Sequence, residues 1–328
     1  MARLRTAVVG CGFFGSLHAK RYAGHPDSDL VAVVDTDPAR AASVAAEHGV
    51  EPLTDYRALI GRVDAVSVAT PANLHYEVAR DLLAAGIHAL VEKPMTHDLA
   101  TARHLIEIAA SSGAVLQIGL IENFSSAFRA LKSVVDDPLY IEATRIAPWK
   151  ARATDVDVVL DMMIHDIDVI LGMVPSRVTS VEALGAPVLT RTEDIVNARL
   201  AFENGCVANV VASRVAVKTE RKARVFQPDS YVVCDFAAGT LFRLDKAGDP
   251  ETEGLAALRP DQQTIPKEDA LDNEIAEFIA AARDRRRPVV DGERGFEALR
   301  VALMIKQSVA GHRALVESRR AQPEGPRP

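Results

Sequence analysis

The chain has 328 residues, of which 48% are hydrophobic and 25% are charged. This composition is typical of a globular protein, and the length favours two domains. The net charge of −7 argues against a nucleic-acid or anionic-membrane surface, and three scattered cysteines argue against a disulfide framework. No apolar run reaches the roughly 20 residues of a membrane span, and no segment resembles a signal peptide. We therefore expect a cytoplasmic protein.

A dinucleotide-binding pattern stands at the start of the chain. Residues 4–9 (LRTAVV) are typical of a short strand and run directly into the glycine turn GCGFFG at residues 10–15. A helical pattern follows, and then a second strand at residues 30–34. The first glycine permits the tight turn, the second lets the backbone approach a pyrophosphate, and the third lets helix and strand pack closely. The residues expected to contact the cofactor here are Gly10, Gly12, Phe13, Phe14, Gly15 and Asp35.

Asp35 also indicates which cofactor binds. It lies twenty residues after Gly15, where a carboxylate accepts hydrogen bonds from the adenosine ribose hydroxyls. The same charge repels a 2′-phosphate, and Thr36 and Asp37 come next in place of an arginine. Arg40 lies one turn into the following helix, which leaves dual use open. NAD is therefore favoured over NADP.

Strands and helices then alternate as in a Rossmann-type, doubly wound parallel sheet. Helices are predicted at 38–48, 74–85 and 99–110, and strands at 65–69, 88–91 and 115–118. Ligands of such sheets bind beyond the carboxyl ends of the strands, and two of these ends are polar. Lys93 is either a solvated partner of Glu92 or a functional side chain whose direction Pro94 restricts, and its place at this edge favours function. The further residues expected at the cofactor are Thr70, Pro71, Asn73, His75, Glu92 and Lys93.

A second domain is predicted where the pattern changes after residue 119. A helix at 123–135 and a strand at 140–146 precede an apolar helix, and from 177 to about 242 strand follows strand with short turns. Such a run favours a largely antiparallel sheet. An irregular loop is predicted at 245–267, and helices at 268–284 and 295–317. The expected organisation is an α/β NAD-binding domain (1–121), an α+β domain with an open, largely antiparallel sheet (122–318), and a disordered tail (319–328).

The helix at residues 157–171 carries a narrow polar stripe on an otherwise apolar surface. Asp157, Asp161, His165 and Asp168 fall on one side of it at about 100° per residue. A stripe that faces solvent would normally carry lysine, arginine and glutamate. A stripe of only aspartate and histidine indicates an internal cavity. The alternative is a core helix with a few satisfied polar groups.

These motifs together resemble a known family. The turn GCGFFG, the loop TPANLH at 70–75, Glu92-Lys93-Pro94, and Asp161 four residues before His165 are similar to the glucose–fructose oxidoreductase/inositol dehydrogenase/MocA (Gfo/Idh/MocA) family, over the chain to about residue 317. The resemblance implies a Rossmann domain, a C-terminal sheet that mediates a homodimer or homotetramer, and NAD(P)-dependent oxidation of a sugar or cyclitol hydroxyl. It also implies that Lys93, Asp161 and His165 are catalytic.

A narrower resemblance concerns the substrate. The runs VVLDMMIHDIDVI, DIVNARLAFENGCVANVVASR and RKARVFQPDSYVVCDF are similar to the family's UDP-N-acetylglucosamine 3-dehydrogenases of lipid A synthesis. Those enzymes oxidise the sugar 3-hydroxyl ahead of a transamination. In the segment 119–127, Leu120 and Asn123 stand where relatives often have histidine and arginine, so we assign this segment no substrate role.

Alcohol oxidation needs a base for the hydroxyl proton and an acceptor for the hydride. His165 is the predicted base because imidazole titrates closest to neutrality, and Lys93 would stabilise the alkoxide charge. Lys93 is the base instead if burial favours its neutral form, and Asp161 either orients His165 or binds a neighbouring hydroxyl. Basic residues around Trp149 suit a diphosphate, although ordinary surface charge is the alternative. The predicted substrate contacts are Arg145, Trp149, Arg152, Asp161 and His165.

Three other functions are weighed against this one. The nearest is a dehydrogenase for a free sugar, inositol or a UDP-sugar uronic acid. A non-catalytic NAD-binding sensor or scaffold is disfavoured by the Lys93, Asp161 and His165 set. A hydrolase with Asp161, His165 and Asp166 as metal ligands leaves the glycine turn unexplained, so no metal is predicted. The basic residues between 214 and 224 would serve an interface or face water.

Overall fold

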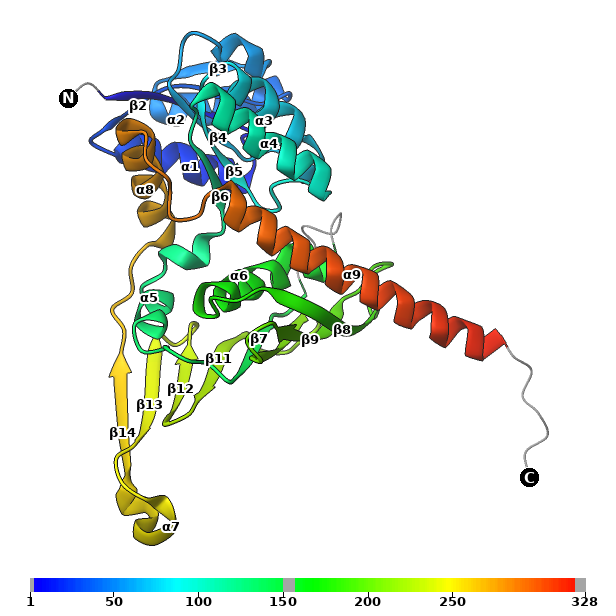
Figure 1. Ribbon diagram of the computed structural model, residues 1–328. Coiled ribbons are helices and arrows are strands. Elements are labelled where there is room, and N and C mark those ends of the chain that lie inside the picture. The colour runs from blue at the N-terminus through cyan, green and yellow to red at the C-terminus, as the bar shows by residue number, and fades with distance from the viewer. Residues whose placement is uncertain (1–2, 150–156, 322–328) are drawn as a thin grey trace. The chain divides into compact units, whose positions relative to one another are not determined.

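The computed structural model describes residues 3–149 and 157–321, with side chains to residue 314 (Figure 1). They form two compact units. The first consists of the chain up to Ser125 together with Asp269–Leu299, and the second consists of Ser126–Glu268 and the chain from Arg300 onward. Among the described helices, none is both long and apolar enough to cross a membrane.

The first unit contains a six-stranded parallel sheet in the order β3-β2-β1-β4-β5-β6. Its strands are β1 (Leu4–Val9), β2 (Ser28–Val34), β3 (Glu51–Leu53), β4 (Ala65–Val68), β5 (His88–Glu92) and β6 (Leu116–Gly119). Its helices are α1 (Phe13–Gly24), α2 (Pro38–His48), α3 (His75–Ala84), α4 (Leu99–Ser112) and α8 (Ala270–Asp284), with short 3₁₀ turns η1 (Tyr56–Leu59), η2 (Ala72–Leu74) and η3 (Ile121–Phe124). This topology confirms the predicted doubly wound sheet.

Burial on both faces explains why the inner parts of the central strands are largely apolar. All four residues of β4 are buried, as parallel strands covered by helices require. Helices lie on both faces: α1 packs against α2 and α8, and α3 packs against α4 (Figure 1). The strand β3, which the sequence analysis did not predict, is three residues long, contains Pro52 and is mostly exposed, so it has little apolar pattern to detect.

The second unit is built on an eight-stranded sheet in the order β14-β13-β12-β11-β7-β10-β9-β8. Its strands are β7 (Tyr140–Ile146), β8 (Val178–Ala186), β9 (Ile195–Phe202), β10 (Val207–Ser213), β11 (Glu220–Gln227), β12 (Ser230–Asp235), β13 (Thr240–Lys246) and β14 (Leu258–Thr264). Only β7 and β10, the fifth and sixth strands in this order, pair in parallel. The expected open, largely antiparallel sheet is therefore confirmed.

Helices cover one face of this second sheet (Figure 1). These helices are α5 (Ser126–Lys132), a π-helical turn η4 (Val159–Met163) that continues into α6 (Ile164–Met173), and the end of α9 (Gly292–Ala321). The short α7 (Pro250–Glu253) with η5 (Gly254–Ala257) instead connects β13 to β14 at one end of the sheet (Figure 1). α6 packs on β7 and β10, and α5 packs on β12 and β13. Residues of β7 accordingly alternate between buried and half-buried. The covered face holds the core of this unit.

Three boundaries differ from the sequence prediction. Residues 269–299, which were predicted to belong to the second domain, cluster with the first unit, because α8 packs on α1 and Arg21 pairs with Asp269 and Asp272 at 2.6 and 2.5 Å. The predicted loop at 245–267 contains α7, η5 and the edge strand β14. α9 continues to Ala321, so the predicted tail begins as helix, and residues 322–328 lie outside the described part.

Candidate active site

The glycine turn between β1 and α1 has two glycines that the protein itself requires. Gly10 has a φ of +98°, and a Cβ there would lie 2.5 Å from the carbonyl oxygen of Ala69. A Cβ on Gly15 would lie 1.7 Å from the carbonyl oxygen of Gly10. A Cβ on Gly12, by contrast, would meet no atom within 4 Å. The absence of a side chain at Gly12 therefore leaves open space, which fits close approach by a bound pyrophosphate.

Asp35 follows β2 and is held by main-chain donors. One carboxylate oxygen accepts from the backbone N–H of Cys11 at 2.8 Å, and the other accepts from that of Asp37 at 2.9 Å. The residue is 9% exposed, and Arg40 lies 3.6 Å from the oxygen that Cys11 binds. The carboxylate is thereby tied to the glycine turn, and each oxygen keeps a lone pair for a further donor such as a ribose hydroxyl. Phe13 and Phe14, at the start of α1, are exposed at 65% and 47%.

His75 joins the loops that follow β4 and β5. Its ring is buried, with Nδ1 2.8 Å from the carbonyl oxygen of Pro94 and Nε2 2.9 Å from that of Thr70. Burial lowers the pKa of His75, and the two carbonyl contacts only partly oppose this effect. A neutral imidazole has one N–H and donates to one carbonyl at a time. His75 therefore positions both polar loops, and Thr70 and Pro71 lie on one of them.

The loop after β4 also contains a buried hydroxyl that suits a ligand. Thr70 Oγ1 has no hydrogen-bond partner among the described residues, although a buried polar group normally has one. Asn73 lies in η2 on the same loop. An orphaned hydroxyl beyond the carboxyl end of a strand fits a polar group of a bound dinucleotide. The residues of the first unit that were predicted to bind NAD thus follow neighbouring strands of one sheet edge.

The Glu92-Lys93-Pro94 segment follows β5, and the Lys93–Pro94 peptide bond is cis. Glu92 Oε1 lies 3.0 Å from Nε2 of His18, on α1. His18 Nδ1 lies 2.9 Å from Ser67 Oγ, to which the Tyr22 hydroxyl also bonds at 2.8 Å. Lys93 is half-buried. The carboxylate before this lysine is therefore part of a buried polar network, which the sequence analysis missed because its members are far apart in the chain.

In the second unit, Asp161 lies in the π-helical turn η4 and His165 lies in the first turn of α6. Both side chains are half-buried. Single π-helical turns are rare and are often found at functional sites. The other two members of the predicted stripe, Asp157 and Asp168, lie in environments that favour a structural role. Asp157 accepts from the backbone N–H groups of residues 159 and 160 and pairs with Lys306 at 2.7 Å, and Asp168 is completely buried.

Arg145 does not have the setting of a phosphate ligand. Its side chain points to the covered face of β7, where it forms a bidentate ion pair with Asp166 of α6 at 2.8 and 3.1 Å. Arg145 is 4% exposed and Asp166 is 3% exposed. The expectation that Arg145 binds substrate is therefore replaced by a structural role. The pairing also removes Asp166 from the alternative set of metal ligands.

The remaining predicted substrate contacts are Trp149 and Arg152. Trp149 is 37% exposed, and the Arg214 guanidinium carbon lies 5.7 Å from the centre of its ring. Arg152 lies outside the described residues. Members of the basic group between 214 and 224 form ion pairs, since Arg214 binds Asp194, Lys222 binds Asp235 and Arg224 binds Glu142. These pairs favour a structural role for that group.

A parallel sheet with a glycine turn, a carboxylate after the second strand and a second α+β unit defines an NAD-binding oxidoreductase of the Rossmann class. The chain belongs to the Gfo/Idh/MocA family. Residues 4–120 match the model described as oxidoreductase family, NAD-binding Rossmann fold, and residues 117–233 match the GFO/IDH/MocA C-terminal domain. The family assigned by resemblance is thus confirmed.

Two named relatives give the comparison more detail. The chain is 37% identical over 310 residues to UDP-N-acetylglucosamine 3-dehydrogenase of Acidithiobacillus ferrooxidans, which covers 94% of this chain and 98% of that protein. A solved structure of this enzyme has a TM-score of 0.89 and covers 95% of this chain and 99% of its own. The chain is also 25% identical over 331 residues to inositol 2-dehydrogenase of Rhizobium meliloti, covering 95% of this chain and 98% of that protein.

A third comparison concerns the fold alone. Scyllo-inositol dehydrogenase of Lactobacillus casei, solved with bound NAD(H) and scyllo-inositol, has a TM-score of 0.78 at 20% identity and covers 94% of this chain and 98% of its own. The named relatives are sugar and inositol dehydrogenases, and this chain is an oxidoreductase of the same family.

Proposed function

We propose that this protein oxidises the 3-hydroxyl of UDP-N-acetylglucosamine with NAD⁺ and yields the 3-keto sugar, which a transamination would then consume. The observation that carries the proposal is the likeness to the Acidithiobacillus ferrooxidans enzyme. It extends over 94% of the chain at 37% identity, whereas the inositol dehydrogenase of Rhizobium meliloti is 25% identical over a similar length. A nucleotide sugar is therefore favoured over a free sugar, an inositol or a UDP-sugar uronic acid.

The cofactor is proposed to bind along the strand ends of the first unit. The Gly10–Gly15 turn and the N-terminus of α1 suit the pyrophosphate, and the Asp35 carboxylate suits the ribose hydroxyls. NAD is favoured over NADP because Asp35 is held in place by two backbone N–H groups and would repel a 2′-phosphate. Arg40, whose guanidinium lies beside this carboxylate, is the group that would bind such a phosphate if Asp35 were absent.

The proposed chemistry separates the hydride from the proton. A bound NAD⁺ would supply the acceptor for the hydride that leaves carbon 3 of the sugar. His165 takes the hydroxyl proton as general base, and Asp161 orients its ring or binds a neighbouring hydroxyl. Lys93 stabilises the negative charge that develops on the oxygen, or acts as the base itself. Trp149, which is partly exposed, is proposed to face the substrate.

We also propose a homo-oligomer formed through the half-exposed face of the second unit's sheet. On that face Tyr140, Phe226 and Tyr231 form a row with ring centres 5.5 and 4.8 Å apart, and Phe226 is 37% exposed. Aromatic rows on an open sheet suit the apolar centre of an interface. Sedimentation analysis should show a dimer or tetramer that Phe226→Lys dissociates, and a monomeric wild-type protein would contradict this part of the proposal.

The composition and the absence of a membrane-spanning helix among the described residues are compatible with a cytoplasmic location.

The decisive experiment is an NADH absorbance assay on a substrate panel. UDP-N-acetylglucosamine should give NADH, with kcat/KM above that for glucose, myo-inositol and UDP-glucuronic acid. Lys93→Met and His165→Asn should each lower kcat by roughly 10²–10⁴-fold, the usual contribution of general acid–base assistance. Arg57→Gln, which changes a half-exposed ion pair of the first unit, is the control and should retain wild-type turnover.

Two outcomes would overturn the proposal. A higher kcat/KM for inositol or a uronic acid would reassign the substrate. Calorimetric NAD binding without turnover on any member of the panel would favour the sensor or scaffold function.

A further inference from the structure

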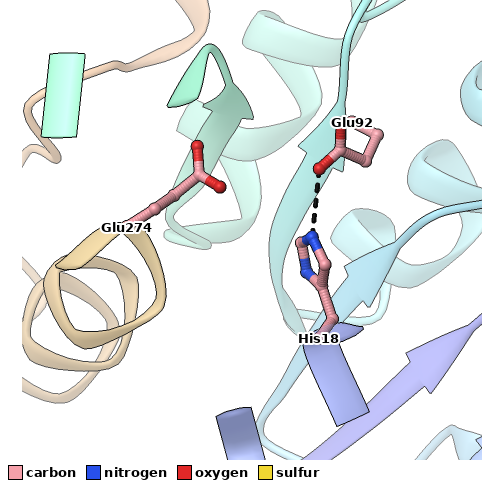
Figure 2. A group of neighbouring side chains, drawn as sticks. All are labelled: His18, Glu92 and Glu274. Carbon is pink, nitrogen blue, oxygen red and sulfur yellow. Dashed lines mark hydrogen bonds and ion pairs between the residues drawn. The ribbon is translucent and has the colours of Figure 1, made fainter. Parts of the chain in front are cut away.

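Three side chains from distant parts of the sequence meet inside the first unit. His18 comes from α1, Glu92 from the end of β5 and Glu274 from α8 (Figure 2). One imidazole nitrogen and one oxygen from each carboxyl group lie within 4.8 Å of one another. His18 and Glu274 are completely buried, and the Glu92 side chain is 14% exposed. Two carboxyl groups thus lie close to a single imidazole in a largely buried space.

Glu92 is well supported in this cluster. Its Oε1 lies 3.0 Å from His18 Nε2, and the His18 ring is held from its other side by Ser67. The side chain also lies over Gly119 of β6, where an added Cβ would be 2.9 Å from the same Glu92 oxygen. Burial raises the pKa of Glu92, but the hydrogen bond from His18 and the positive charge of Lys93 are among the interactions that outweigh this effect, so that its pKa is lowered. Glu92 is the ionised member of the pair.

Glu274, unlike Glu92, lies in an environment that does not support a negative charge. Neither of its carboxyl oxygens has a hydrogen-bond partner among the described residues, and its carboxyl group points toward His18 and Glu92 (Figure 2). A buried carboxylate without partners is strongly disfavoured, because it loses its hydration and gains nothing in exchange. Burial and the negative charge of Glu92 both raise its pKa well above the usual value.

The remaining charged groups on the elements packed against α8 do not neutralise Glu274. On α1, Arg21 pairs with Asp269 and Asp272, Lys20 is exposed, and Tyr22 bonds to Ser67. On η3, the titratable group is Glu122, which is itself acidic. A proton is therefore the simplest positive charge that this site can hold.

We propose that Glu274 is a neutral carboxylic acid that donates a hydrogen bond to the Glu92 carboxylate and so acts as a positioning residue for Glu92 and the adjoining Lys93. A separation of up to 4.8 Å is closed by rotation of the Glu274 side chain or by one bridging water. Glu92 is then held between two donors, His18 and Glu274. The part of this inference that concerns Lys93 rests on the proposed function, whereas the protonation of Glu274 does not.

Infrared spectroscopy of the full-length protein tests the protonation directly. At pH 7.5 the wild type should show the C=O stretching band of a carboxylic acid, which shifts in D₂O. The band should be absent from Glu274→Gln and present in Glu277→Gln, the matched control on the same helix, where the carboxylate pairs with Arg286 at 2.7 Å. A wild-type spectrum without this band would overturn the proposal, as would a band that survives in Glu274→Gln. Because the wild type alone suffices for the first comparison, the test stands even if a variant does not fold.

The pH dependence of unfolding provides a second test. Between the unfolded pKa of a glutamate, about 4.3, and the raised folded value, the folded protein binds one proton more than the unfolded chain. The stabilisation is therefore complete below pH 4 and is lost as pH rises. Relative to Glu274→Gln, the wild-type folding equilibrium constant should fall tenfold for each pH unit from about 5 upward. Parallel pH profiles for the two proteins would contradict the proposal.

A bound cation is the competing occupant of this site. Calorimetric titration with Zn²⁺ should show no stoichiometric binding to the wild type. Binding of one Zn²⁺ that abolishes the infrared band and is lost in Glu274→Gln would replace the proton with a metal site.

Kinetics test the positioning role. Glu274→Ala should lower kcat by up to about 100-fold with an unchanged Kd for NAD, since a displacement of 1 Å in a reacting group has this effect, and Glu274→Gln should restore it. Wild-type kcat in Glu274→Ala would remove the positioning role. Absence of turnover in the wild type would refute the proposed function and leave the infrared result intact.

Discussion

The guanidinium of Arg145 and the carboxylate of Asp166 form a bidentate ion pair in the core of the second unit, with N–O distances of 2.8 and 3.1 Å. The pair joins the central strand β7 to α6, the helix that carries His165. Because both groups are almost completely buried, neither is solvated when the other is removed. The placement of the proposed catalytic helix on its sheet therefore depends on a charge pair as well as on apolar packing.

Breaking this pair should be costly. Asp166→Asn removes the carboxylate that forms the bidentate pair with the buried Arg145 guanidinium, and we expect a loss of about 3–5 kcal/mol in the free energy of unfolding. The double replacement Arg145→Met with Asp166→Leu should cost less than Asp166→Asn alone, since it removes both charges. Denaturant unfolding measures these values, and Arg5→Gln, in an exposed pair with Asp64, is the control with a much smaller effect. Equal effects of Asp166→Asn and Arg5→Gln would contradict the structural role.

Two glycines of the turn should respond differently to alanine. Gly12→Ala adds a methyl group to open space, so the thermal midpoint should stay near that of the wild type while the Kd for NAD rises about tenfold or more, equivalent to about 1.4 kcal/mol. Gly15→Ala places a Cβ against the Gly10 carbonyl and should lower the thermal midpoint strongly. Calorimetry of NAD binding and thermal melting separate the two effects. Unchanged NAD affinity in Gly12→Ala would argue against a pyrophosphate at this turn.

Cofactor choice should depend on Asp35 and Arg40 together. Asp35→Ser removes the charge that repels a 2′-phosphate and releases the Arg40 guanidinium, which lies 3.6 Å from it. The ratio of kcat/KM for NADP⁺ over NAD⁺ should rise about 10- to 100-fold, in line with a few kcal/mol for one close charge interaction. Adding Arg40→Ala should cancel most of the gain. If Asp35→Ser leaves the ratio unchanged, the carboxylate does not select the cofactor.

Acid should destabilise the second unit through Asp194. This carboxylate is completely buried and accepts from three backbone N–H groups, of residues 188–190, and from Arg214 at 2.8 Å. Burial raises its pKa, but these donors prevail, and the pKa of Asp194 lies well below its usual range. The stabilisation is therefore complete above the unfolded pKa of about 3.9 and is lost as pH falls, at about 1.4 kcal/mol per pH unit.

Urea unfolding between pH 2 and 7 checks this prediction. Asp194→Asn should be less stable than the wild type at pH 7, and the difference should shrink below pH 4. Glu193→Gln, which alters the neighbouring partly exposed carboxylate, should keep the wild-type slope. An acid profile of Asp194→Asn parallel to that of the wild type would assign the acid sensitivity to other groups.

Features set by local chemistry were predictable from the sequence. The glycine turn follows β1, Asp35 follows β2, and the Glu92-Lys93-Pro94 segment lies at the end of β5, as the sequence predicted. These positions were predictable because a tight turn and a parallel strand each have a recognisable pattern in neighbouring residues. The strand β14 was missed because its sequence, LRPDQQT, is polar and its residues are mostly exposed at a sheet edge. An edge strand with one open side has no apolar alternation to detect.

Long-range pairs account for what the sequence did not predict. Arg145 was expected to bind phosphate because it is one of the basic residues close to Trp149 in the sequence, but its partner Asp166 lies 21 residues further along. α8 belongs with the first unit through contacts such as Gln117 Nε2 to the Glu274 carbonyl oxygen, across 157 residues. Glu274 itself is a glutamate in an amphipathic helix, and only the fold reveals that it lies on the buried side.

A π-helical turn contains one residue more than the α-helical turn that it replaces. Deleting Met162 or Met163 from the turn at Val159–Met163 would therefore allow an uninterrupted α-helix. Such a deletion would change the direction of Asp161 around the helix axis relative to His165, while the Arg145 anchor of α6 stayed in place. Chain length at this one turn thus controls the direction of a carboxylate without any change of side-chain chemistry.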